Sequence, residues 1–123
     1  MQEISNSELA VLNVLWHHSP LNASEIVNAL AAQQMHEKTV KTLLNRLVKK
    51  QAIGFEKQGR AYLYQPLINQ NEYQIKQSKT FIERVFGGNL SPLIAGFAKH
   101  NELNEKDIAE LKSVIEQWEK EQK

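Results

Sequence analysis

The sequence predicts a mainly α fold with a small β-hairpin, in which a winged helix-turn-helix domain at residues 1–70 precedes a three-helix region at residues 71–123. Three observations lead to this prediction. Apolar residues recur at helical spacing in three short segments before residue 50, they alternate with polar residues over 53–64, and helical spacing returns after residue 72. A chain of 123 residues fits one domain, or a small domain with an extension.

The first predicted helix covers residues 6–18. Ser5 and Glu8 have the S-x-x-E spacing of a capping box, in which each side chain accepts a hydrogen bond from the other residue's backbone N–H. The apolar residues that follow at helical spacing are Leu9, Leu12, Leu15 and Trp16. Ser19 and Pro20 are expected to end the helix.

A second helix is predicted from Asn22 to about Gln33. Asn22 lies three residues before Glu25 and can cap the helix with its side-chain oxygen. The residues expected on its buried side are Ile26, Val27 and Leu30.

The third predicted helix, residues 37–50, has an apolar side and a cationic side. Its apolar residues, at positions i, i+3, i+4, i+7 and i+8, are Val40, Leu43, Leu44, Leu47 and Val48. The surrounding segment 34–60 holds seven basic and two acidic residues, a net charge of +5, whereas residues 1–33 hold three acids and no Lys or Arg. This asymmetry is typical of a surface that binds a polyanion.

A β-hairpin is predicted over residues 53–64, because the helical spacing gives way to alternation. Ile53 and Phe55 alternate with polar neighbours in the first strand, and Tyr62 and Tyr64 alternate with Ala61 and Leu63 in the second. Gly59 can adopt a positive φ at the turn, with Lys57 and Arg60 near the tip. Three short helices followed by such a hairpin predict a winged helix-turn-helix.

Residues after Pro66 form a polar junction, and three further helices are expected beyond it. The first covers 72–86 and ends at Gly87 and Gly88, the second opens with Ser91 as N-cap before Pro92, and the third begins at Asn104. Three helices in about 50 residues have too little mass to bury their apolar stripes alone, so a homodimer is expected. The predicted interface residues are Phe81, Ile82, Val85, Phe86, Leu93, Ile94, Phe97, Ile108, Leu111, Ile115 and Trp118.

Several classes of protein are disfavoured by composition. The chain has no cysteine, which excludes disulfides, thiolate metal sites and thiol nucleophiles. Its five glycines form no phosphate-binding loop, and the adjacent His17 and His18 cannot chelate one ion as an i, i+4 pair would. We therefore expect no enzyme activity, cofactor or metal. The N-terminus lacks a signal-peptide pattern and no apolar run approaches the roughly 20 residues of a membrane span, so we expect a cytoplasmic protein without membrane insertion.

The helix at 37–50 has the residues that reading DNA requires. Such a helix needs cations for phosphates and short or forked polar side chains for base edges in the major groove. The side chains expected to read bases are Thr39, Thr42, Asn45 and Arg46. The side chains expected to contact phosphates are Lys38, Lys41, Lys49, Lys50, Lys57 and Arg60. Double-stranded DNA is the expected partner.

Two other interpretations of the basic helix are open. An amphipathic basic helix can simply be a solvated surface. A winged helix can also bind an acidic protein partner, which makes a protein-interaction module the alternative function. A basic helix followed by strand, basic turn and strand favours DNA. A preference for one palindrome that survives rising salt distinguishes DNA from the protein partner.

Four segments of the chain resemble the BlaI/MecI/CopY family of bacterial repressors: ISNSELAVLNVLW, KTVKTLLNRLVKK, GRAYLYQP and SKTFIERVFGGNLSPLIAGF. The resemblance implies a homodimeric transcriptional repressor whose winged helices bind an inverted repeat in operator DNA and whose C-terminal helices form the dimer interface. It places the operator contacts on Lys38, Thr39, Lys41, Thr42 and Arg46, with those of the wing on Lys57 and Arg60.

The chain departs from the family pattern at four places. In β-lactam-responsive members a proteolytic cut at an Asn-Phe bond relieves repression, which implies a membrane sensor protease as a partner; the matching pair here is Gly96-Phe97. The cysteine cluster of copper-responsive members is absent. His36-Glu37 stands where the family often has Ser-Pro, and Gln51 stands where a glycine usually ends the helix, at a small expected cost in stability.

Overall fold

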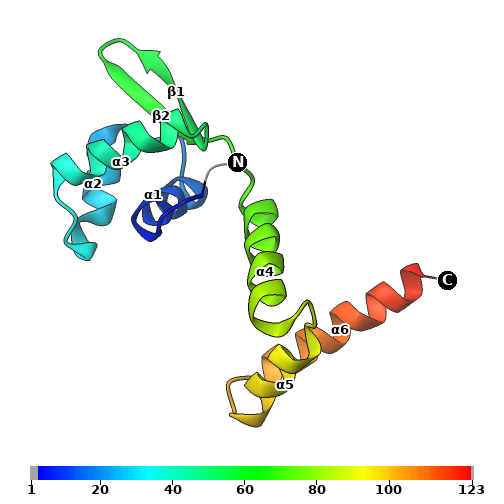
Figure 1. The fold of residues 1–123 in the computed structure, drawn as a ribbon. Helices are drawn as coiled ribbons and strands as arrows, with labels where there is room; N and C mark the ends of the chain where they lie inside the picture. The colour runs from blue at the N-terminus through cyan, green and yellow to red at the C-terminus, as the bar shows by residue number, and fades with distance from the viewer. Residues whose placement is uncertain (1–2, 123) are drawn as a thin grey trace. The chain divides into compact units, whose positions relative to one another are not determined.

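The computed structural model describes residues 3–122. Its elements, in chain order, are α1 (Asn6–His17), α2 (Ala23–Leu30), a 3-10 turn (Ala31–Gln33), α3 (Glu37–Lys49), β1 (Ile53–Gln58), β2 (Ala61–Pro66), α4 (Gln70–Phe86), α5 (Ser91–Lys99) and α6 (Glu105–Glu121) (Figure 1). The predicted fold class, mainly helical with one antiparallel hairpin, is confirmed. The chain forms two compact units, Met1–Gln74 and Ile75–Lys123, which divide inside α4.

Capping boxes begin three of the helices. In α1, the Glu8 N–H donates to Ser5 Oγ at 3.1 Å, and the Ser5 N–H donates to Glu8 Oε1 at 2.8 Å. The other two boxes are Asn22 with Glu25 at α2 and Asn104 with Asp107 at α6. Each box satisfies N–H groups that the first turn of a helix leaves without partners.

The N-cap predicted for α5 is wrong. Ser91 is already helical, Leu90 occupies the N-cap position, and no side chain caps the helix there. The Ser91 N–H instead donates to Asn89 Oδ1 at 3.2 Å, so Asn89 satisfies one N–H group at this end of α5.

The core of the first unit lies between α1, α2 and α3, which gather beneath the hairpin in Figure 1. α1 contacts α2, α3 and β2, and α3 contacts β1. Each large aliphatic side chain removed from water stabilises the fold by roughly 1.5–3 kcal/mol. The buried residues of this core are Ile4, Val11, Leu12, Leu15, Leu21, Ile26, Leu30, Val40, Leu43, Leu44, Leu47, Ala52 and Ile53.

The hairpin pairs its strands in a register that leaves Gly59 and Arg60 as a two-residue turn. Gln58 faces Ala61 across this turn, and Gly59 has the predicted positive φ, 62°. At the other end of the hairpin, Leu21 exchanges two backbone hydrogen bonds with Tyr64, of 3.1 and 2.8 Å. The base of the wing is therefore tied to the segment between α1 and α2.

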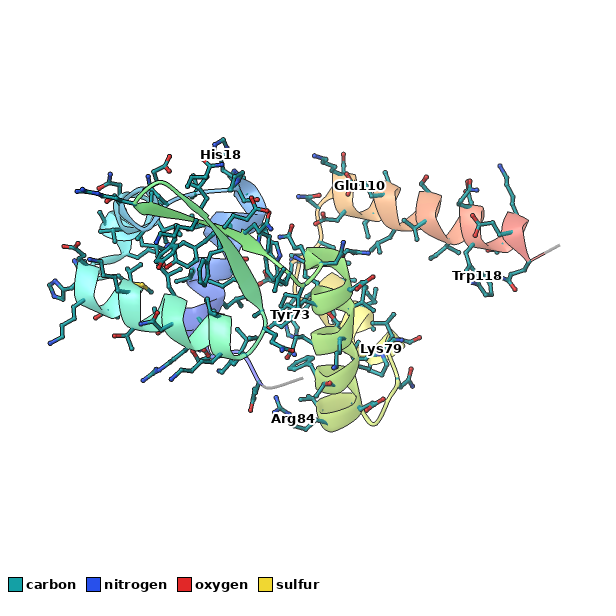
Figure 2. All side chains as sticks on the ribbon, turned by 90° about the horizontal axis from the view of Figure 1, so that it is seen from above. His18, Tyr73, Lys79, Arg84, Glu110 and Trp118 are labelled. Atoms are coloured by element: carbon teal, nitrogen blue, oxygen red, sulfur yellow. The ribbon has the colours of Figure 1, made fainter. Side chains whose placement is uncertain are left out.

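The second unit has no buried core of its own. None of residues 75–122 is buried, and large apolar side chains stand exposed on each helix, among them Phe97 (49%) and Trp118 (59%). Figure 2 shows Trp118 projecting from α6. Gly87 and Gly88 end α4, as predicted, and both have a positive φ. Among the helices within residues 3–122, none is long and apolar enough to cross a membrane.

Candidate nucleic-acid interface

α3 separates its apolar residues from its polar residues. Val40, Leu43, Leu44 and Leu47 are buried, and Val48 is half-buried, as the helical spacing predicted. The polar residues on the opposite side are all exposed: Lys38, Thr39, Lys41, Thr42, Asn45, Arg46 and Lys49. The aliphatic side anchors the helix, so its donors face solvent along nearly four turns.

A hollow of about 510 Å³ lies along α3, between His36 and Arg46. The residues that line it are His36, Lys38, Thr39, Thr42, Leu43 and Arg46. Thr42 Oγ1 donates to the Lys38 carbonyl oxygen at 3.0 Å. Because that hydrogen is already used, Thr42 presents only its methyl group and its oxygen lone pairs to a partner.

Lys41 and Glu37 form an ion pair of 3.1 Å on the same helix, with side chains 58% and 67% exposed. An exposed pair at i, i+4 contributes little stability, about 0.3–0.5 kcal/mol, so Lys41 remains available to another anion. Burial and the neighbouring Tyr62 raise the pKa of Tyr64, and the charge of Lys41 acts in the opposite direction.

The wing carries two exposed cations, Lys57 and Arg60, on a frame of aromatic rings. The ring centroids of Phe55 and Tyr62 lie 4.7 Å apart in an edge-to-face arrangement. The ring centroids of Phe55 and Tyr64 lie 5.8 Å apart. Such pairs contribute about 0.5–1.5 kcal/mol each beyond the area they bury. The aromatic residues therefore support the wing that displays the cations.

One residue predicted to contact phosphate, Lys50, is instead bonded within the first unit. Its Nζ lies 2.6 Å from Glu8 Oε1 and 2.8 Å from the Glu3 carbonyl oxygen, and its side chain is only 20% exposed. Burial pushes the pKa of Glu8 upward, but hydrogen bonds from Lys50 and Ser5 and the charge of Lys50 outweigh it, so the pKa lies below its ordinary value of 4.5. Lys50 thus neutralises a buried carboxylate within the first unit, and it is not among the phosphate contacts that we propose.

Within residues 3–122, no group of three His, Cys, Asp or Glu side chains is placed to hold a metal ion. The chemistry of the exposed α3 surface and the wing is hydrogen-bond donation and positive charge.

Comparison with known proteins decides the family. A model of the penicillinase repressor family matches residues 4–117. The chain belongs to the penicillinase repressor family. The penicillinase repressors of Bacillus licheniformis and Staphylococcus aureus are 34% and 36% identical to it, over 94% and 92% of this chain and 91% and 90% of theirs. The methicillin resistance regulatory protein MecI of Staphylococcus aureus is 31% identical over 92% of this chain and 93% of its own.

Solved structures agree with this penicillinase repressor assignment. The solution structure of the DNA-binding domain of the repressor BlaI is 38% identical, covers 59% of this chain and 94% of its own, and superposes with a TM-score of 0.53. Monomeric Bacillus licheniformis BlaI, solved with the blaP half-operator, is also 38% identical, with a TM-score of 0.52 over 58% of this chain and 89% of its own. MepR of Staphylococcus aureus, 19% identical with a TM-score of 0.51 over 98% of this chain and 82% of its own, shares the fold.

These findings confirm a winged-helix fold and a BlaI/MecI-type DNA-binding transcriptional repressor. As a member of a family of repressors, the protein is not an enzyme.

Proposed function

We propose that this repressor binds, as a homodimer, to an inverted repeat in operator DNA through α3 and the β1–β2 wing. The observation that carries the proposal is the division of α3 into a buried aliphatic side and an exposed row of donors. The complex of the similar monomeric BlaI of Bacillus licheniformis with the blaP half-operator supports the proposed contact with DNA. The proposed base contacts are Thr39, Thr42, Asn45 and Arg46, and the proposed phosphate contacts are Lys38, Lys41, Lys49, Lys57 and Arg60.

We propose that the exposed apolar side chains of α4, α5 and α6 pack against the same helices of a second copy of the chain. With none of residues 75–122 buried, this unit gains its core only by association. A dimer also raises the effective concentration of the second winged helix once the first is bound. On an inverted repeat, the two α3 helices would enter major grooves about 34–36 Å apart. The bacterial cytoplasm, where operator DNA lies, is the proposed location.

A membrane sensor protease is proposed as a regulatory partner from the family resemblance. The bond that corresponds to the Asn-Phe cleavage site is Gly96-Phe97, inside α5. A protease needs an extended segment, so cleavage there requires local unwinding of the helix. Mass spectrometry of the protein after incubation with membranes containing such a sensor provides the test. A fragment ending at Gly96 supports the proposal, and an intact chain opposes it.

The DNA-binding proposal is tested with fragments that the purified protein selects from random DNA. We expect an inverted repeat that binds more tightly than either half alone, and a dimer at micromolar concentration by sedimentation. If all five proposed phosphate contacts form in both protomers, the logarithm of affinity should fall with the logarithm of salt concentration with a slope of about −9. Lys112→Ala, on α6, removes a cation outside this surface and should leave the slope unchanged. Selection that yields no palindrome would favour the acidic protein partner.

A further inference from the structure

The segment that joins β2 to α4 is fastened to the first unit, although its polar sequence predicted a junction between modules. The indole Nε1–H of Trp16, in α1, donates a 2.9 Å hydrogen bond to the carbonyl oxygen of Ile68. The ring centroids of Trp16 and Tyr73 lie 5.7 Å apart, and the angle between the ring planes is 45° (Figure 2 labels Tyr73, at the start of α4). Trp16, Ile68 and Tyr73 all pack against the core of the first unit. We call these three residues the α4 latch.

Backbone hydrogen bonds on both sides of Ile68 hold the same segment. The Leu67 N–H donates to the Ala52 carbonyl oxygen at 2.9 Å, which ties the chain to the start of β1. The Asn69 side-chain oxygen accepts from the Glu72 N–H at 3.0 Å, and the Asn69 backbone carbonyl oxygen accepts from the Tyr73 N–H at 3.0 Å. α4 is therefore capped where it begins, directly after the residue that Trp16 holds.

α4 passes from one unit into the other. It runs without a break from Gln70 to Phe86, while the division between the two compact units falls after Gln74. Its first turn, with Tyr73, thus belongs to the winged helix, and later residues of the same helix carry proposed dimer contacts. A flexible tether between two binding modules accepts many separations between their targets, whereas a fastened helix accepts few.

We propose that the α4 latch is a positioning device that restricts the spacing between operator half-sites which the dimer accepts. The inference rests on the proposed dimeric function. Trp16 lies on α1 and acts through the start of α4, so it is a positioning residue and not a contact to DNA. With the latch formed, both α3 helices are presented at one separation. Without it, the chain can bend at Ile68, between the Leu67–Ala52 hydrogen bond and the cap of α4, and several separations bind with similar affinity.

The test uses duplexes with two identical half-sites whose separation changes in single base-pair steps, and affinity is measured by fluorescence anisotropy at one salt concentration. For the unchanged protein we expect about a tenfold loss of affinity when two base pairs are inserted or removed between the half-sites. Trp16→Phe, which keeps a ring but loses the N–H, and Tyr73→Leu, which loses the ring, should reduce that loss to about threefold or less. Tyr73→Phe keeps the ring beside Trp16 and is the matched control, which should retain the full loss.

A duplex with a single half-site separates positioning from folding. Every variant should bind it within about twofold of the unchanged protein, because each winged helix still presents α3. The latch is overturned if Trp16→Phe and Tyr73→Leu both keep the original spacing profile, or if they weaken single and paired half-sites equally. An unchanged protein that binds two half-sites no better than one overturns the proposed dimeric function itself, which no result with the variants alone would do.

Discussion

Lys50 Nζ lies 2.6 Å from Glu8 Oε1, joining the end of α3 to the first turn of α1. Glu8 is only 1% exposed, and its Oε1 also accepts a hydrogen bond from the Ser5 N–H. The carboxylate that caps α1 is thus neutralised by the residue that caps α3. One ion pair therefore couples α3 to α1.

We predict that Lys50→Met destabilises the first unit, because it leaves the buried carboxylate of Glu8 without its cation. The cost should be about 2–3 kcal/mol in urea unfolding, lower than for a fully buried pair because the Lys50 side chain is partly exposed. Lys49→Met, one residue earlier and exposed, should cost less than about 0.5 kcal/mol. If both variants lose equally little stability, the ion pair contributes nothing to the fold.

We predict that the same carboxylate makes stability depend on pH. The pKa of Glu8 is lower in the folded state than its ordinary value of 4.5, so the unfolded chain binds more protons at acidic pH. This contribution is complete above the ordinary pKa and is lost as the pH falls through the folded-state pKa. Unfolding free energies measured from neutral pH downward should therefore fall more steeply for the unchanged protein than for Glu8→Gln. Glu119→Gln, on the exposed side of α6, should follow the unchanged protein.

We predict that Gln51→Gly stabilises the protein. Gln51 follows α3 with a φ of 62°, and the N–H groups of Gln51 and Ala52 donate to Val48 and Leu47 carbonyl oxygens in a Schellman motif. Only glycine adopts this conformation without strain, so we expect a gain of about 0.5–1 kcal/mol in the free energy of unfolding. Ala29→Gly, in the ordinary helical backbone of α2, should instead lower the free energy of unfolding.

We predict that Glu37→Gln strengthens binding to DNA. Glu37 is exposed in the first turn of α3 and pairs with Lys41 at 3.1 Å, so its charge opposes a phosphate and competes for a proposed phosphate contact. Removing the charge should raise affinity by about 1 kcal/mol for each half-site at low salt. Glu105→Gln, in the first turn of α6, is the matched control and should leave affinity unchanged. An unaltered affinity for Glu37→Gln would place Glu37 away from the phosphates.

Local spacing was sufficient to predict the surfaces of α3, since the helical period alone determines which residues share a side. Val40, Leu43, Leu44 and Leu47 are buried for that reason, and the capping boxes were predictable because both partners lie within four residues. Contacts between distant residues were not predictable in this way. Glu8 and Lys50 each had a sufficient local explanation, as a cap and as part of a basic patch, and nothing in the spacing joins residues 42 positions apart.

The latch illustrates the same limit. Trp16 fitted the apolar pattern of its helix, and the segment after Pro66 has the polar composition of a linker. Its fastening depends on an indole N–H that reaches the backbone carbonyl of Ile68, 52 positions away in the sequence. Every residue has a backbone carbonyl, so the sequence does not indicate which carbonyl oxygen accepts a hydrogen bond from a distant side chain. Only the fold shows that the acceptor for Trp16 is Ile68.

We predict that Arg46 and Lys49, two exposed cations three residues apart on α3, have different effects on DNA recognition. Arg46 lines the hollow along α3, and its forked guanidinium can donate two hydrogen bonds to a guanine. Arg46→Ala should therefore cost about 1–3 kcal/mol on the preferred operator and relax the sequence selected from random DNA.

Lys49→Ala is the matched comparison, because it also removes one cation from the exposed side of α3. A lysine that contacts only phosphate should weaken all sequences alike and reduce the salt slope by about 0.9 for each protomer. Sequencing of the DNA bound by each variant, together with affinities at several salt concentrations, separates the two roles. Equal losses on every sequence would make Arg46 a phosphate contact, and base reading would then depend on Thr39, Thr42 and Asn45.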